Sequence, residues 1–167
     1  DRSTFLDELD VSGVFGRLLA TNSRFDFWAT PMDCFGCARI ELHHCTLLAR
    51  SSGVALFLSS SEATALVTNS VLLSFSDPPL YANGLDELVL DHNLLFGPYV
   101  AASVEDVGVT LAELEALPPP VRATGNLFVD PDLQLATLLL EPSSPAVNAG
   151  GDALAAGAPT TVLADAE

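Results

Sequence analysis

A repeat of about two dozen residues is the feature that most constrains the fold of this chain. Each copy has two apolar residues spaced by two, a polar residue, Asn or His, a small Ser, Cys or Asn, and an apolar residue two positions further on. The copies are Leu18–Phe25, Ile40–Leu47, Ala65–Leu72 and Leu88–Leu95, with the Asn or His at Asn22, His44, Asn69 and His92. A period of this length with strand-like units is typical of a solenoid.

Within each repeat, short apolar runs alternate with turn residues. In the second repeat the runs are 40–42, 45–48 and 54–58, separated by turns rich in serine. Three short strands per turn is the pattern of a right-handed parallel β-helix. A helical solenoid would instead need apolar residues spaced by three and four over a long stretch. The sequence therefore predicts an all-β fold, a right-handed parallel β-helix (solenoid) of about five to six coils with one short helical excursion.

Stacking of the coils explains the repeat physically. Equivalent residues of neighbouring coils lie about 4.8 Å apart in a parallel sheet. We expect three interior columns: Leu18, Ile40, Ala65 and Leu88; Ala20, Leu42, Val67 and Leu90; and Phe25, Leu47, Leu72 and Leu95. The Asn/His residues are expected to form a ladder at a bend, where their side chains would satisfy backbone groups that the strands leave unpaired: Asn22, His44, Asn69 and His92. The next column, which contains Cys45, is expected to be small because the chain turns inward there.

The whole chain, residues 1–167, is expected to form one domain. Regular coils are expected over 14–103 and a helical excursion over 104–121, where Thr110 and Glu113 match a capping box. A closing coil is expected over 124–150 and a tail of small residues over 151–167. Residues 1–16 fit either an imperfect first coil or a short helix that covers the end of the stack.

Charge excludes several classes of partner. The chain has 22 acidic residues against six arginines, and its formal net charge is -16. Nucleic acid is therefore not an expected partner, because phosphate backbones need neutralising cations. Anionic lipid is not expected either, and no apolar stretch reaches the roughly 18 residues that a membrane helix needs. The composition fits a secreted or surface protein, or one from a salty habitat.

The cysteines and two aspartates are the candidates for cross-links and metal ions. Cys34 and Cys37 form either a local disulfide or two thiols. With His43, His44 and Cys45 nearby, they also have the composition of a zinc site, although the repeat already explains His44 and Cys45.

Asp130 and Asp132 flank Pro131 and either coordinate calcium or cap a turn. No cofactor is expected beyond this calcium.

Catalytic chemistry has weaker support, and no catalytic residue is assigned. Arg17 and Arg39 lie one coil apart and could flank a lyase groove. A hydrolase would need carboxylates gathered on one wall, for which the candidates are Glu41, Glu62, Asp86, Glu87 and Asp91. Exposed acids on an acidic protein are the simpler explanation. For carbohydrate contact, Phe27 and Trp28 are the best exposed aromatic pair.

One stretch resembles a known family. Gly125–Pro131, Leu135 and Leu138–Gly150, which includes Ser-Pro-Ala-Val-Asn-Ala-Gly, are similar to the closing motif of secreted bacterial right-handed parallel β-helix proteins of the choice-of-anchor Q type. The upstream repeat also resembles the coils of that group and of pectate-lyase-like proteins. Asn148 stands where the family usually has Asp, and the usual final strand does not follow. The resemblance implies a secreted β-helix, here as a truncated or processed piece or one completed by a partner's strand.

These observations favour a non-catalytic structural β-helix on the cell surface or outside the cell, such as a stalk, an adhesin segment or a filament subunit. Open strand edges at the ends of a β-helix attract further strands, and neither end shows an obvious cap in the sequence. Association with itself or with other chains through these ends is therefore expected. The alternative is a domain that binds or cleaves polysaccharide along one wall.

Overall fold

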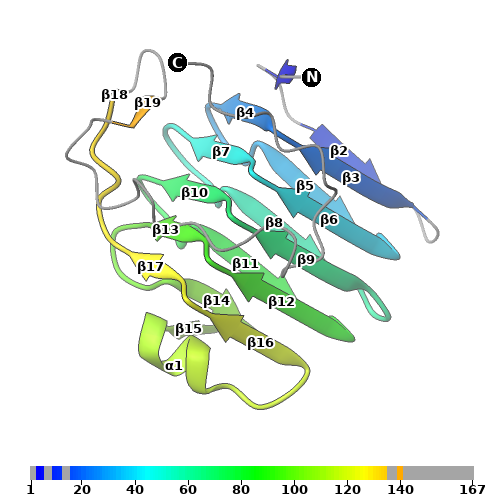
Figure 1. Ribbon diagram of the computed structural model, residues 1–167. Coiled ribbons are helices and arrows are strands. Elements are labelled where there is room, and N and C mark those ends of the chain that lie inside the picture. Colours follow the sequence, from blue (N-terminus) through cyan, green and yellow to red (C-terminus); the bar gives the residue numbers. More distant parts are fainter. Residues whose placement is uncertain (1–2, 6–8, 13–15, 135–138, 141–167) are drawn as a thin grey trace.

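The computed structural model describes residues 3–5, 9–12, 16–134 and 139–140, and it shows a β-solenoid. Four complete turns are flanked by an incomplete turn at each end, and the strands stack into three sheets (Figure 1). Sheet A contains β1 (Ser3–Phe5), β4 (Ser23–Phe27), β7 (Thr46–Ala49), β10 (Val71–Ser74), β13 (Leu94–Phe96) and β17 (Leu127–Phe128). Sheet B contains β2 (Leu9–Ser12), β5 (Met32–Phe35), β8 (Leu56–Ser59), β11 (Leu80–Asn83), β14 (Ala102–Val104) and β15 (Val107–Val109). Sheet C contains β3 (Arg17–Thr21), β6 (Arg39–His43), β9 (Thr64–Thr68), β12 (Glu87–Asp91) and β16 (Val121–Thr124).

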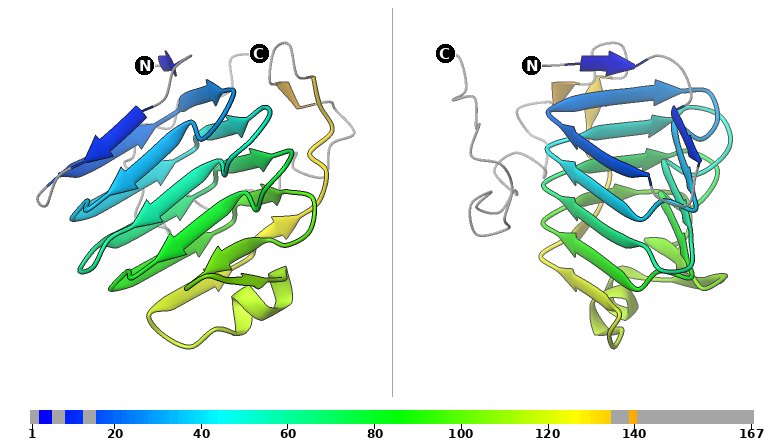
Figure 2. Two further views of the ribbon diagram at one scale, coloured as in Figure 1. Left: turned by 180° about the vertical axis from the view of Figure 1, so that it is seen from behind. Right: turned by 90° about the vertical axis from the view of Figure 1, so that its right-hand side faces the viewer.

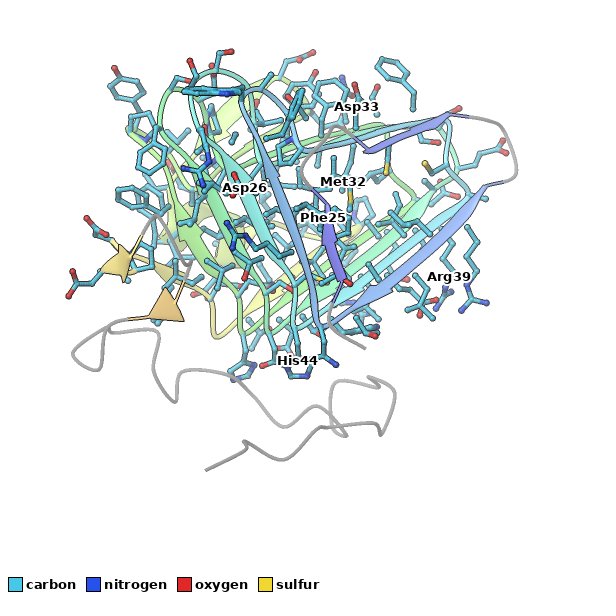
Figure 3. The ribbon with its side chains drawn as sticks, turned by 90° about the horizontal axis from the view of Figure 1, so that it is seen from above. Phe25, Asp26, Met32, Asp33, Arg39 and His44 are labelled. Carbon is cyan, nitrogen blue, oxygen red and sulfur yellow. The ribbon has the colours of Figure 1, made fainter. Side chains whose placement is uncertain are left out.

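The solenoid is right-handed, as the sequence predicts. Viewed from the N-terminal end, the chain runs clockwise from Asp26 in sheet A through Asp33 in sheet B to Arg39 in sheet C and His44 at the next corner (Figure 3). It recedes from the viewer as it turns, which makes the spiral right-handed. All strand pairs within the four complete turns are parallel. The predicted right-handed parallel β-helix with one short helix is therefore confirmed, with four complete turns in the described residues where five to six coils were expected.

The interior columns have the predicted register. Leu18 pairs with Ile40, Ile40 with Ala65, and Ala65 with Leu88. The other two columns are aligned in the same way, and most of their members are fully buried in one continuous core. Burying a leucine or isoleucine side chain stabilises a protein by about 1.5–3 kcal/mol. These columns therefore supply much of the free energy that holds the coils together.

At the N-terminal end the chain forms an incomplete coil rather than a helix. β1 pairs with β4 in sheet A, and β2 pairs with β5 in sheet B. Sheet C has no strand at this level in the described part of the chain, because its order ends at β3. Of the two alternatives for residues 1–16, the imperfect first coil is the one that the described strands show.

The excursion ends sheet B at the C-terminal end of the stack and places a helix against the core. β15 pairs antiparallel with β14 and so ends the parallel ladder of sheet B. The helix α1 (Leu111–Ala116) follows, and its capping box between Thr110 and Glu113 forms as predicted. Leu114 of α1 is fully buried in the core at the end opposite the N-terminus (Figures 1 and 2). This differs from the expectation of two uncapped ends, because the local pattern revealed the helix but not its position over the core.

Beyond α1, two strands begin a further coil. β16 pairs with β12 in sheet C, and β17 pairs with β13 in sheet A. The chain then leaves the coil, and β18 (Leu133–Gln134) pairs antiparallel with β19 (Leu139–Leu140) in a separate two-stranded sheet. The rest of the expected closing coil, including the Ser-Pro-Ala-Val-Asn-Ala-Gly stretch, and the tail over 151–167 lie outside the described residues.

Candidate functional site

The Asn/His ladder occupies the corner between sheets C and A. All four residues have a left-handed backbone conformation, with φ values of 50° at Asn22, 54° at His44, 49° at Asn69 and 52° at His92. Gly125 occupies the equivalent position of the last coil, with φ of 64°. Asn and Gly tolerate this conformation best, and His is also enriched there. The residue types of the ladder are therefore explained by a one-residue corner.

Buried backbone N–H groups at this corner donate to side chains of the column that directly follows the Asn/His ladder in the sequence. The sequence reasoning missed this role. The backbone N–H of Cys45 donates to Ser70 Oγ at 3.0 Å, and the N–H of Ser70 donates to Asn93 Oδ1 at 2.9 Å. The N–H of Asn93 donates to Asn126 Oδ1 at 2.9 Å. These side chains form an internal hydrogen-bond ladder, whereas the role of satisfying this backbone was expected of the Asn/His side chains.

The cysteines are packing residues in this structure. Cys34, Cys37 and Cys45 are buried, and all three are thiols outside any disulfide. Burial raises the pKa of the Cys45 thiol to about 11, so it stays protonated and unreactive at neutral pH. Within the described residues, no three His, Cys, Asp or Glu side chains are placed to hold a metal ion. Cys34-x-x-Cys37 and the His43–Cys45 segment therefore do not come together as a zinc site.

Asp130 has a local hydrogen-bonding role. Its Oδ1 accepts a hydrogen bond from the backbone N–H of Asp132 at 2.9 Å, and Asp132 has a φ of 52°. This is the geometry of an aspartate that caps a turn. It corresponds to the turn-capping alternative for this pair.

A charged cluster lies on the outer face of sheet C. Arg17 and Arg39 pair across adjacent coils, and both donate to Oε1 of Glu41, Arg17 at 2.7 Å. The bond from Arg39 lowers the pKa of Glu41, with Arg17 contributing and burial opposing. Buried His43 follows, with Nδ1 2.7 Å from Thr68 Oγ1 and Nε2 3.9 Å from Glu41 Oε2. Burial lowers the pKa of His43, so this imidazole is neutral.

Next to this cluster, the outer face of sheet C holds a groove of about 430 Å³. The side chains of Leu66 and Val89 give the groove an apolar surface. Arg39 and Arg122 also line the groove and lie three coils apart. Arg122 donates to Glu87 in an exposed ion pair. The groove also contains threonine hydroxyls and a second carboxylate, from Thr64, Thr68, Thr124 and Asp91. It therefore offers donors and acceptors of both charges in one place.

Among the carboxylates considered for a hydrolase, Glu87 and Asp91 are too far apart to form a catalytic pair. Glu41 is bound by two arginines, and Glu62 lies in an exposed turn with a φ of 80°. Asp86 is exposed just before β12. Glu87 and Asp91 stand at opposite ends of β12, about 13 Å apart along a strand of that length. Hydrolytic pairs stand about 5–9.5 Å apart.

Aromatic side chains form a row on the outer face of sheet B. The rings of Phe57 and Tyr81 are stacked with centroids 4.6 Å apart, and those of Phe35 and Phe57 with centroids 5.6 Å apart. A sugar stacks on an open ring face, and Phe57 already has a ring stacked on each side of it. Of the predicted carbohydrate pair, Trp28 is 69% exposed and Phe27 is only partly exposed. Trp28 is therefore the exposed member of the pair.

Comparisons of the chain with protein-family models, with curated proteins and with solved structures found no match. The solenoid fold therefore rests on the structure itself, and the resemblance to choice-of-anchor Q proteins stays a prediction. None of the helical structure in the described part of the chain has the length and apolar character needed to span a membrane.

Proposed function

We propose that the chain is a non-catalytic structural segment of an extracellular or cell-surface β-solenoid, such as a stalk or an adhesin segment. Secretion is part of this proposal, and it is supported by the net charge of -16 and by the absence of lysine, which together give a self-repelling, soluble surface. The core runs without a break through all four turns. Such a stack is a rigid spacer, because each coil contacts only its neighbours and the whole length forms one rod.

The observation that carries the proposal is the difference between the two ends. At the C-terminal end, antiparallel β15 stops the addition of parallel strands to sheet B, and Leu114 of α1 is buried in the core. At the N-terminal end, the outward edges of β1, β2 and β3 meet no further strand of the described chain. Unpaired edges attract strands. The segment is therefore suited to join more β-structure at one end and to finish the stack at the other, which supports a stalk or adhesin segment over a filament subunit.

Molar mass measured by light scattering on a size-exclusion column, over a wide range of protein concentration, tests this proposal. We expect limited association that grows with concentration and with salt, because screening weakens repulsion between copies of the same charge. Long linear particles would contradict a closed C-terminal end. A strict monomer at every concentration would contradict association through the open end.

A second candidate function, polysaccharide binding, is favoured by the groove on sheet C. The apolar side chains of the groove match the apolar face of a sugar ring, and its guanidinium and carboxylate groups match the hydroxyl groups of the sugar. A glycan array, with uronic-acid polymers and calcium included, tests this function. Binding that is lost in Arg122→Gln and kept in Arg24→Gln, a change on sheet A, would support it. An array without signal would contradict it.

A further inference from the structure

We propose that a pocket at the corner between sheets B and C binds a small organic cation whose apolar part has the size of one ring. The exposed residue Glu105 lines the pocket together with apolar side chains: Ala82, Leu85, Leu88, Val104, Pro120 and Val121. The inference goes beyond the stalk proposal and does not depend on it.

The pocket exists because the chain leaves the stack at this corner. Ala82 and Leu88 of one coil pair with Val104 and Val121 of the next. A short corner joins the first two residues, whereas residues 105–120 join the second two by way of β15 and α1 (Figure 1). The excursion therefore does not stack on the short corner as one coil stacks on another.

Backbone contact between the two coils is made at the two ends of the excursion. The N–H of Glu105 donates to Ala82 O at 3.0 Å, and the N–H of Leu88 donates to Pro120 O at 3.0 Å. Between these two bonds, Leu85 packs against the core but is only partly buried. The pocket is thus the part of the corner that the excursion leaves uncovered.

The interior of the pocket is apolar, and its volume limits the ligand. Val104 and Val121 are 9% and 8% exposed, whereas Leu88 is 1% exposed, so solvent reaches the pocket at the two valines. An apolar cavity holds water poorly, and one of about 150 Å³ accommodates benzene. The volume of about 220 Å³ therefore fits one ring with a short substituent. It is smaller than the roughly 300–1,000 Å³ of sites for drug-sized ligands.

The charge beside the pocket is negative. The N–H of Gly84 donates to Oε1 of Glu105 at 2.8 Å, which holds the carboxylate at this corner. A carboxylate accepts several hydrogen bonds, so a ligand N–H can share it with the backbone. Among the described residues that line the pocket, Glu105 alone is charged. An adjoining groove adds Asp86 and the ion pair of Glu87 with Arg122. A cation is therefore favoured over a neutral or anionic molecule of the same shape.

Three probes of similar shape and different charge test the site: benzylammonium, benzyl alcohol and benzoate. Each is titrated into the isotope-labelled chain at low salt, and NMR shifts of the backbone amides report where it binds. We expect saturable shifts confined to 82–88, 104–105 and 121. Benzylammonium should bind about fivefold more tightly than benzyl alcohol, the upper end for an exposed ion pair, and benzoate should bind most weakly. Added salt should reduce this preference.

Three variants separate the charge from the apolar pocket. Glu105→Gln keeps an oxygen that accepts from Gly84 and should abolish the preference for benzylammonium while benzyl alcohol still binds. Glu62→Gln is the matched control, because Glu62 is also exposed, has positive φ and lies at the same corner one coil earlier; it should change nothing. Leu85→Phe adds bulk inside the pocket and should weaken the binding of benzylammonium and benzyl alcohol about tenfold. Thermal unfolding establishes that each variant is folded.

Shifts that do not saturate, or that spread over the whole surface, would overturn the site. Equal binding of the three probes, or an unchanged preference in Glu105→Gln, would overturn the choice of a cation. Pocket shifts that change with protein concentration alone would also overturn the proposal, because an apolar side chain from a second copy would then be the occupant.

Discussion

Replacing Asn93 by alanine tests the internal hydrogen-bond ladder that holds the C-to-A corner. Asn93 is 1% exposed, accepts a hydrogen bond from the N–H of Ser70 and donates to Val67 O at 2.8 Å and to Asn126 Oδ1 at 3.0 Å. Alanine would leave the Ser70 N–H and the Val67 carbonyl buried without these partners. Each such group costs about 1–3 kcal/mol, so we expect Asn93→Ala to lower the free energy of unfolding by about 2–6 kcal/mol.

Urea unfolding followed by circular dichroism measures this loss. Asn93→Ser is the matched control, because Ser70 already shows that serine at this position accepts from the preceding coil and donates to a carbonyl two residues back. The serine variant should lose about half as much free energy, since only the bonds to Val67 and Asn126 disappear. A loss below about 1 kcal/mol for Asn93→Ala, the typical net value of one hydrogen bond, would refute the reasoning.

Three further predictions concern the corner, pH and the thiols. His44→Gly should leave the free energy of unfolding nearly unchanged, whereas His44→Val should lower it by about 1–2 kcal/mol. Glycine adopts the left-handed conformation of this corner without cost, and valine does not. Urea unfolding of both variants checks this. Since burial lowers the pKa of His43 in the folded state, unfolding titrations should show stability falling as pH drops below about 6.5, where the unfolded state takes up the proton. His43→Gln should reduce this loss of stability below about pH 6.5, and an unchanged loss would contradict its assignment to His43. The thiol reagent DTNB should not react with the buried cysteines until the chain is unfolded, so fast labelling of the native chain would contradict their burial.

The sequence pattern was sufficient to predict the stacking. Two apolar residues spaced by two, repeated at every coil, can be buried on one side only if equivalent strands pair in register, and Ile40 and Ala65 do so. The corner was also visible in the pattern, because Gly125 stands where the earlier copies have Asn or His. Glycine at that position is the signal that could have identified a left-handed backbone and not a side-chain role.

Other features were beyond local reasoning. The capping box at Thr110 predicts where α1 begins, but the place of Leu114 over the core depends on contacts with distant strands. The hairpin between β14 and β15 was missed because its turn residues, Glu105 and Asp106, both have positive φ although neither is glycine or asparagine. The cluster around Glu41 could be predicted only with the exact strand register, because its two arginines come from different coils.

An engineered disulfide between coils tests the central claim, which is that residues about two dozen positions apart lie directly over one another. Leu66 and Val89 pair on the outer face of sheet C, and paired residues of adjacent parallel strands lie about 4.8 Å apart, within the range that a disulfide spans. The Leu66→Cys, Val89→Cys double variant should cross-link on mild oxidation, as seen by mass spectrometry of a non-reduced digest. The Leu66→Cys, Arg122→Cys pair, two coils apart, should not. Equal cross-linking of both pairs, or of neither, would contradict the stacked solenoid.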